Sequence, residues 1–316
     1  MKIRSTRRTF LKSSGILALG SSLDPGALLA AGPAEEVIDV HQHVNFHGRF
    51  DKQLVDHQRK MGVTRTVLLP SGSAIARAST HEGRSDGLAA RVHPTEAAIL
   101  LSERFPRSFI WFCNEVPDLP NARERIEGYL KEGAAGIGES KFNIDCTSVH
   151  MEMMAELAAD YGVPILIHFQ HNKYNTGFEN FHKILEKFPK ANFIGHAQTW
   201  WGNIDKNHVQ KEMYPKTPVT PGGTTDRYLS DYPNMFGDFS AGSGLNSIAR
   251  DEDHAVEFIA RHQDQLLYGS DCADIAGAGD KCSGSKTLAL LRKLAPDETV
   301  LRKILSGNAR RIIRFD

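Results

Sequence analysis

The sequence has no excess of charge of either sign. Its 38 lysine and arginine residues balance 38 aspartate and glutamate residues, so no net field draws the chain toward nucleic acid or an anionic membrane. It also lacks an apolar run of the ~20 residues that a bilayer span requires. Because 41% of its 316 residues are hydrophobic, the composition is that of an ordinary globular protein. We therefore expect a small-molecule partner, no nucleic-acid partner and no permanent membrane span.

Cysteine is scarce, and its four copies show no zinc-type pairing. Cys113, Cys146, Cys272 and Cys282 form no CxxC motif, which argues against a cysteine-ligated metal site. In an oxidising compartment one disulfide could form, and Cys272 and Cys282 are the nearest pair in the sequence. The spacing alone does not decide between free thiols and a disulfide.

The first 34 residues differ in pattern from the rest of the chain. The basic segment STRRTFLK precedes the weakly apolar stretch SSGILALGSSL and then small residues near Ala30, which is the order of an export signal. Arg7 and Arg8, followed by TFL, resemble the twin-arginine class, an address read by the twin-arginine translocation machinery. We therefore expect residues 1–34 to be a signal peptide and the mature protein, residues 35–316, to be periplasmic or otherwise exported.

From residue 36 onward, short apolar or β-branched runs alternate with longer helical patterns. The runs predict eight strands, at 36–43, 64–72, 108–116, 134–142, 164–169, 191–197, 234–240 and 265–271. Many of the helical patterns between them end at Gly or Pro. Eight alternating units in roughly 280 residues predict a single-domain α/β fold, the (β/α)8 or TIM barrel. A doubly wound open sheet is the alternative, but the first strand lacks a GxGxxG motif.

The longest connection between predicted elements runs from Gln198 to about Gly223 and contains TWWGN and YPKTPVTPGG. Long loops after barrel strands lie on the catalytic face, so we expect this segment to form a lid or a pocket wall. A disordered surface insertion is the alternative. Trp200 and Trp201, which follow the sixth strand, are weak candidates for substrate contacts.

Ionisable side chains stand at the carboxyl ends of several predicted strands, where barrel enzymes place their active sites. Period-two alternation puts His41 and His43 of DVHQH on one side of the first strand. His168 ends the fifth strand, His196 the sixth and Asp271 the eighth. Imidazole and carboxylate groups suit zinc or a similar divalent ion. One HxH motif is weak evidence, but five candidate ligands at one end of a barrel predict a metal site.

The motifs DVHQH, ILIHF, FIGHA and YGSD resemble the metal-site strands of the amidohydrolase superfamily. The phrases MGVTRTVLLP, DYPNMFGDFSAGSG, QLLYGSDCAD and LSGNARRII are similar to its amidohydrolase-related family of metal-dependent hydrolases. The similarity extends from about Val37 to Ile313 and identifies the superfamily better than the substrate. It implies a barrel enzyme that activates water on one or two divalent ions, with zinc as the expected metal.

The resemblance also implies a role for each matching residue. His41 and His43 would bind a first metal, and Asp271 would bind it and take a proton from water. His168 and His196 would hold a second metal. In members with one metal, the fifth-strand histidine joins the first site and His196 polarises the substrate, so Asp271 and His196 are the catalytic candidates. A divalent cation lowers the pKa of bound water from about 15.7 toward 7, and a neighbouring carboxylate can pass the proton to a leaving group.

The fourth predicted strand, within GIGESKF, bears on the metal count. Strand alternation puts Ile137, Glu139 and Lys141 on one face. The family bridges two ions with a carbamylated lysine from this strand in many members and with a glutamate in others. Because a protonated lysine cannot bind a cation, we expect Glu139 to be the bridge. The alternatives are carbamylated Lys141 as the bridge, and a buried Glu139–Lys141 ion pair with no role in metal binding. With Glu139 as the bridge, two ions are expected and Lys141 is a cation suited to a substrate carboxylate or oxyanion.

Two enzymatic functions follow from the resemblance. The first is hydrolysis of an amide, ester or lactone bond in a small molecule. The second is decarboxylation, because the same family includes metal-dependent decarboxylases (lyases) that use one ion. A bridging Glu139 favours hydrolysis. A non-catalytic binding protein is a third class, but it would be expected to have lost Asp271 or a histidine ligand. A homodimer is the base-rate expectation for the assembly.

Overall fold

The computed structural model describes residues 35–73 and 92–315. The expected twin-arginine signal, residues 1–34, lies outside the described residues. One compact unit spans Glu36–Asp316. None of the helices within the described residues is both long and apolar enough to cross a membrane.

All eight predicted strands are present, each inside its predicted range. They are β1 (Ile38–Gln42), β2 (Arg65–Leu68), β3 (Phe109–Trp111), β4 (Ile137–Ser140), β5 (Pro164–His168), β6 (Asn192–His196), β7 (Met235–Asp238) and β8 (Leu266–Leu267). Every pairing between them is parallel. The strands follow one another in the orders β1-β2-β3 and β4-β5-β6-β7-β8.

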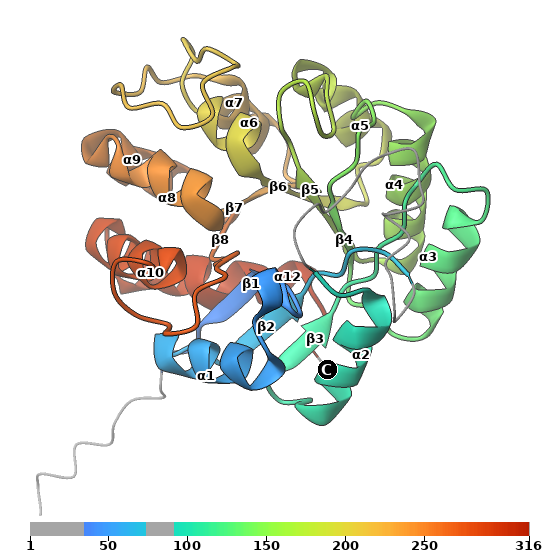
Figure 1. Cartoon of the computed structure of the whole chain (residues 1–316). Coiled ribbons are helices and arrows are strands. Elements are labelled where there is room, and N and C mark those ends of the chain that lie inside the picture. The colour runs from blue at the N-terminus through green and yellow to red at the C-terminus, as the bar shows by residue number, and fades with distance from the viewer. Residues whose placement is uncertain (1–34, 74–91, 316) are drawn as a thin grey trace, which may run out of the picture. The chain divides into compact units, whose positions relative to one another are not determined.

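Backbone hydrogen bonds join these two groups of strands into one barrel. Between β3 and β4, the Cys113 N–H donates to Gly136 O at 2.9 Å and the Gly138 N–H donates to Cys113 O at 2.8 Å. Between β1 and β8, the Val40 N–H donates to Tyr268 O at 3.1 Å. The strands gather at the centre and the helices surround them (Figure 1). The (β/α)8 barrel predicted from the alternating pattern is confirmed.

The helices that surround the strands are α1 (Asp51–Met61), α2 (Thr95–Arg104), α3 (Ala122–Lys131), α4 (Val149–Tyr161), α5 (His182–Lys187), α6 (Ala197–Gly202), α7 (Thr224–Asp231), α8 (Ala241–Ala249), α9 (Glu252–His262), α10 (Ser283–Leu294), α11 (Glu298–Arg302) and α12 (Asn308–Ile312). Shorter turns are η1 (Phe46–Gly48), η3 (Phe178–Asn180) and the π-helical η4 (Lys303–Gly307).

Local sequence signals set the ends of these helices, as α4 illustrates. The hydroxyl of Ser148 accepts a hydrogen bond from the Met151 N–H and caps the first turn. Gly162 ends the helix with a φ of 62°, a left-handed conformation that glycine adopts without a steric penalty. Between these ends, Met154 and Leu157 are buried in the main core cluster, so the helix is held to the barrel by its apolar face.

The barrel interior is filled by an apolar layer. Leu166, Ile194 and Phe236 are partners in register on β5, β6 and β7 and belong to one buried cluster, which also includes Val40 and Val67. Since side chains alternate between the two faces of a strand, the residues two positions further along β5, β6 and β7 also point into the barrel. This layer forms the floor of the site described next.

Candidate metal centre

Polar side chains stand one step above the apolar layer of the barrel. His168 on β5, His196 on β6 and Asp238 on β7 each follow a residue of that layer by two positions. His41 and His43 come from β1 and the residue after it. All five residues are at most 4% exposed. The strand ends therefore bring buried imidazole and carboxylate groups together, as the sequence predicts.

The carboxylate of Glu139, on β4, lies between the histidines. Its Oε2 lies 3.7 Å from His41 Nε2 and 3.6 Å from His43 Nε2. Its Oε1 lies 2.6 Å from His168 Nδ1 and 3.8 Å from His196 Nε2. Each carboxylate oxygen therefore faces a different pair of imidazole nitrogens.

Asp271, after β8, faces the same centre. Its Oδ1 lies 3.9 Å from His41 Nε2 and 3.4 Å from His43 Nε2, and its Oδ2 lies 3.7 Å from His196 Nε2. Donor atoms lie close enough together to hold an ion in three overlapping groups. The first group is His41, His43 and Glu139, the second is Glu139, His168 and His196, and the third is His41, His196 and Asp271. All six residues predicted as ligands thus surround one centre.

The donor set fits a divalent cation. Among the described residues, His41 Nε2 and Asp271 Oδ1 are buried atoms without a hydrogen-bond partner, although buried polar atoms are normally paired. The carboxylates of Glu139 and Asp238 are 1% and 0% exposed, and burial of charge is costly unless the charge is compensated. A divalent ion would satisfy the unpaired atoms and compensate the carboxylates.

The charges around the centre favour the metal-binding protonation states of Glu139, His168 and His196. His41 differs: burial alone would lower its pKa, but the charge of Asp271 and the hydrogen bond to Asp238 raise it well above its usual range. Burial alone would raise the pKa of Glu139, but the positive charge of Lys141 and the hydrogen bond from His168 hold it well below its usual range. Burial and Lys141 lower the pKa of His168, and burial together with His41 lowers the pKa of His196 further. A charged carboxylate and neutral imidazoles are the forms that bind a metal ion.

A second layer of hydrogen bonds orients the imidazole rings. His41 Nδ1 donates to Asp238 Oδ2 at 2.7 Å. Ser240 Oγ donates to the same oxygen at 2.6 Å and accepts from His196 Nδ1 at 2.7 Å. His43 Nδ1 donates to a backbone carbonyl after β2 at 2.7 Å. In each ring the bond at Nδ1 leaves Nε2 to face the centre. The only sequence signal for Asp238 and Ser240 is a weak one, two polar residues at the end of the seventh predicted strand.

Lys141 does not share the position of Glu139. β4 ends at Ser140, and its pairing with β5 shifts register between Ile137 and Ser140, so the predicted alternation does not extend to Lys141. The Lys141 side chain is half-buried, with Nζ 5.7 Å from the centroid of the Tyr174 ring. Glu139 contacts imidazoles rather than the lysine ammonium group.

Trp200 and Trp201, on α6, pack in the core. They are 0% and 2% exposed. The Trp201 ring stacks on Phe239 with 4.6 Å between centroids, and its Nε1 donates to Asp238 O at 2.8 Å. Almost no surface of either ring is left for a substrate, because both fill space between the strands and the surrounding helices. The structure therefore contradicts the prediction that these tryptophans contact substrate.

The long connection after β6 forms part of a cavity wall. A cavity of about 430 Å³ is lined by Gln170 from the end of β5 and by Thr199 and Gln210 from the connection, among others. Gln170 Nε2 donates to Met213 Sδ at 3.7 Å, and Gln170 Oε1 lies 3.2 Å from His168 Nε2. Gln170 therefore lies between this cavity and His168 of the metal centre, and the role of the connection as a wall of the substrate pocket stays a prediction.

The chain matches the sequence profile of a protein family described as amidohydrolase over residues 38–315. The chain belongs to this amidohydrolase family. Members of this family use divalent metals, which agrees with the donor groups assembled here. The family and the barrel also agree with the resemblance carried by the four strand motifs. No curated protein matches the chain.

Solved structures with a similar fold differ in activity. An uncharacterised TIM-barrel protein from Bordetella bronchiseptica is 13% identical, with 88% of this chain and 98% of that chain covered and a TM-score of 0.59. A 2,6-dihydroxybenzoate decarboxylase is 11% identical, with 88% and 98% covered and a TM-score of 0.56. A probable 2-pyrone-4,6-dicarboxylic acid hydrolase from Acinetobacter baumannii is 11% identical, with 87% and 98% covered and a TM-score of 0.56. At these identities the likeness shows the fold alone.

Proposed function

We propose that the protein is a hydrolase that binds two divalent ions, with zinc as the expected metal, and cleaves an amide, ester or lactone bond of a small molecule. The observation that carries this proposal is the position of Glu139, whose two carboxylate oxygens face separate pairs of histidines. His41 and His43 would hold one ion and His168 and His196 the other, with Glu139 between them. Asp271 would complete the first position.

When bound, such ions lower the pKa of a water molecule and polarise a substrate carbonyl. The chain's own groups divide the remaining work. Asp271 directs one oxygen toward His43 and the other toward His196, so its carboxylate can take a proton from the water and deliver it to the leaving group. Half-buried Lys141 supplies positive charge suited to a substrate carboxylate or a developing oxyanion.

Decarboxylation is the second candidate function. It is favoured by Lys141, because a half-buried cation beside the centre also suits a substrate that carries a carboxylate. It needs one ion, and a single ion would leave one oxygen of Glu139 without a metal to bind. The two functions therefore differ in the metal count at this centre and in the product released.

Metal analysis of purified variants tests the role of Glu139. We expect Glu139→Ala to lose one ion per chain relative to the wild type and Lys141→Ala to keep the wild-type count. Inductively coupled plasma mass spectrometry of the dialysed proteins measures this difference. If Lys141→Ala loses the ion and Glu139→Ala retains it, carbamylated Lys141 is the bridge and the proposal for Glu139 is refuted.

An activity screen distinguishes the two reactions. The panel contains lactones, esters, amides and aromatic carboxylates, with hydrolytic products and carbon dioxide measured separately. We expect hydrolysis, and Asp271→Asn, which keeps the size of the side chain, should abolish it. Release of carbon dioxide without any hydrolytic product would refute the hydrolase proposal in favour of decarboxylation.

We also propose that residues 1–34 direct export through the twin-arginine machinery. The support is the Arg7 and Arg8 pair placed before an apolar stretch. Replacing both arginines by lysine should leave the protein in the cytoplasmic fraction, whereas the wild type is recovered from the periplasm. Unchanged export of the double variant would contradict this route. The mass of the protein in solution tests the expected homodimer.

A further inference from the structure

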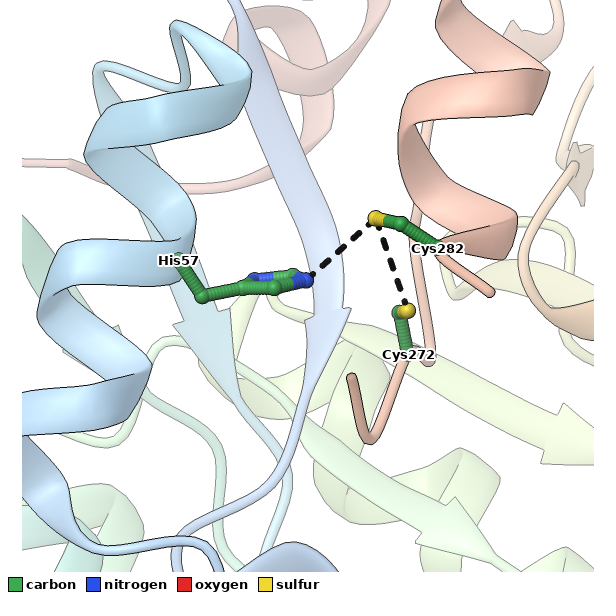
Figure 2. Close-up of side chains that lie close together, drawn as sticks. All are labelled: His57, Cys272 and Cys282. Carbon is green, nitrogen blue, oxygen red and sulfur yellow. Dashed lines mark hydrogen bonds between the residues drawn. The ribbon is translucent and has the colours of Figure 1, made fainter. Parts of the chain in front are cut away.

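A second cluster of metal-binding side chains lies outside the centre described above. Figure 2 shows His57 of α1, Cys272 in the segment after β8 and Cys282 at the start of α10, with their donor atoms directed toward one another. The three side chains belong to residues that are 0%, 3% and 0% exposed. Their donor atoms all lie within 4.8 Å of one another. The cluster shares no residue with the carboxylate–histidine centre.

The distances within this cluster match those around a tetrahedral ion. Cys272 Sγ lies 3.8 Å from Cys282 Sγ, and His57 Nε2 lies 3.5 Å from Cys282 Sγ. In a tetrahedral zinc site the zinc–sulfur bonds are about 2.3 Å long and the zinc–nitrogen bond is about 2.0–2.1 Å long. At tetrahedral angles, two sulfur ligands then lie about 3.8 Å apart, and a sulfur and a nitrogen ligand lie about 3.5 Å apart. The two sulfurs are too distant for a disulfide, in which they lie about 2.0 Å apart, and both cysteines are free.

A fourth soft donor stands beside these three. Met61 follows His57 by four residues on α1, so the two side chains lie on the same face of the helix. Met61 Sδ lies 3.6 Å from Cys282 Sγ. Thiolate, thioether and imidazole groups select soft or borderline ions such as zinc rather than magnesium or calcium. Two thiolates would also neutralise a divalent ion, which suits a buried site.

We propose that His57, Cys272 and Cys282 bind a zinc ion, with Met61 at the fourth position. Zn²⁺ and two thiols would give a neutral zinc dithiolate and release two protons. The site joins α1 to the segment that closes the barrel, so its function is structural. This inference is independent of the proposed hydrolase activity, because none of its ligands belongs to the catalytic centre.

The location of this site gives it a specific structural consequence. Cys272 directly follows Asp271, and β8 is only two residues long, so strand pairing holds little of this segment. The backbone carbonyl of Cys272 accepts hydrogen bonds from Gln42 Nε2 at 3.0 Å and Arg49 Nη1 at 2.7 Å. An ion on the Cys272 thiolate would add a side-chain anchor next to Asp271.

Cobalt substitution tests this site in the complete protein. Thiolate ligands give Co²⁺ an intense charge-transfer band in the near ultraviolet, whereas the imidazole and carboxylate ligands of the other centre do not. The full chain, purified from cobalt-supplemented cells, should show the band. Cys282→Ser should abolish the band and lose one ion per chain. Serine is chosen because its hydroxyl can still accept the capping hydrogen bond that Cys282 accepts from the Ser285 N–H.

Cys146→Ser is the matched control. Cys146 is equally buried, its Sγ donates to Gly177 O at 3.1 Å, and a serine hydroxyl can replace that donor. This variant should keep both the band and the metal count. A cobalt protein without the band, or a band that survives in Cys282→Ser, would overturn the proposal.

The wild-type protein supplies a test that needs no substitution. After denaturation with a chelator and without reductant, all four cysteines should react with a thiol reagent. If two fail to react and peptide mass spectrometry shows a disulfide between Cys272 and Cys282, the pair is oxidised and the zinc site is refuted.

Discussion

The hydrogen bond between Asp238 and His41 predicts a specific effect of the substitution Asp238→Asn. Asp238 Oδ2 accepts from His41 Nδ1 at 2.7 Å, and both side chains are 0% exposed. The bond keeps a proton on Nδ1, so Nε2 presents its lone pair to the centre. Asparagine has nearly the same shape as aspartate but no charge. It therefore makes a weaker hydrogen bond, and the imidazole becomes a poorer metal ligand.

The magnitude follows from the type of contact that is changed. Loss of a partner that orients a metal-binding histidine typically lowers metal affinity about 10-fold to 100-fold, which corresponds to about 1.4–2.7 kcal/mol. Ser240 Oγ donates to the same Asp238 oxygen at 2.6 Å and contacts His196 Nδ1 at 2.7 Å. The substitution therefore also disturbs the Ser240 contact with His196. We therefore expect the upper part of this range.

A second buried aspartate–histidine pair provides a matched control. Asp226 Oδ1 accepts from His262 Nε2 at 2.6 Å, and within the described part of the chain neither residue belongs to a group of metal-binding donors. Asp226→Asn should lower the free energy of unfolding by about 1.5–3 kcal/mol, the contribution of a hydrogen bond to a charged group. It should leave metal affinity unchanged.

Competition with a coloured chelator measures metal affinity, and urea unfolding of the metal-free proteins measures stability. The expected result is a loss of affinity in Asp238→Asn alone. Wild-type affinity in a folded Asp238→Asn protein would refute the reasoning, because it would show that the charge of Asp238 does not control the metal-binding form of His41.

Three further predictions concern stability. Burial alone would raise the pKa of Asp226, but the His262 hydrogen bond and the charge of Arg261 lower it below its usual range. The Asp226 carboxylate therefore stabilises the fold above the unfolded pKa of about 3.9. This stabilisation is lost as the pH falls through the folded pKa. Urea unfolding across acidic pH should show this loss in the wild type, and an equally steep loss in Asp226→Asn would contradict it. Gly136→Ala would place a Cβ atom 2.4 Å from the Phe112 ring. Overpacking of this kind should lower the free energy of unfolding by about 1–3 kcal/mol, and thermal unfolding measures the effect. An unchanged melting temperature would show that the ring moves freely. Trp200→Ala should lower the free energy of unfolding by about 3–5 kcal/mol and leave KM unchanged. A variant of wild-type stability with a raised KM would show that Trp200 contacts the substrate after all.

The barrel could be predicted from the sequence because each strand carries its own local signal. β5, PILIH, is buried along its whole length, and its β-branched and apolar residues are continuous in the sequence. Parallel strands buried on both faces commonly read this way. Because the barrel places all strand ends on one side, the positions of His168 and Asp271 at those ends also predicted that they would lie together.

The prediction failed where a side chain's surroundings depend on distant contacts. The aromatic pair Trp200 and Trp201 follows a strand, and sequence position alone does not distinguish a pocket residue from a core residue. The alternation on β4 predicted that Lys141 would face the centre with Glu139, but the strand ends one residue earlier. Asn175 carried no signal at all, although its Nδ2 donates to Ser140 O at 2.7 Å and to His168 O at 3.0 Å and so joins the ends of β4 and β5.

The cysteine cluster was missed for a related reason. A CxxC search finds ligands that are neighbours in sequence, whereas His57 lies on the first helix and Cys272 and Cys282 lie on the last part of the barrel. Barrel closure brings these segments together, because β8 pairs with β7 and the next residue, Tyr268, accepts a backbone hydrogen bond from Val40 of β1. The spacing rule therefore excludes only one arrangement of a cysteine site.

The same closure positions Asp271, the carboxylate proposed as catalytic. The Asp271 N–H donates to His41 O at 2.8 Å, and the preceding Ser270 N–H donates to Asp39 Oδ1 at 2.8 Å. Both acceptors belong to β1, so the strand that carries His41 and leads into His43 also fixes the backbone of Asp271. The proposed zinc ion would hold the next residue, Cys272. Removal of that ion alone should therefore displace the Asp271 carboxylate and lower kcat. The histidines, which stand at the ends of β1, β5 and β6 and do not depend on the zinc ion, should keep their metal.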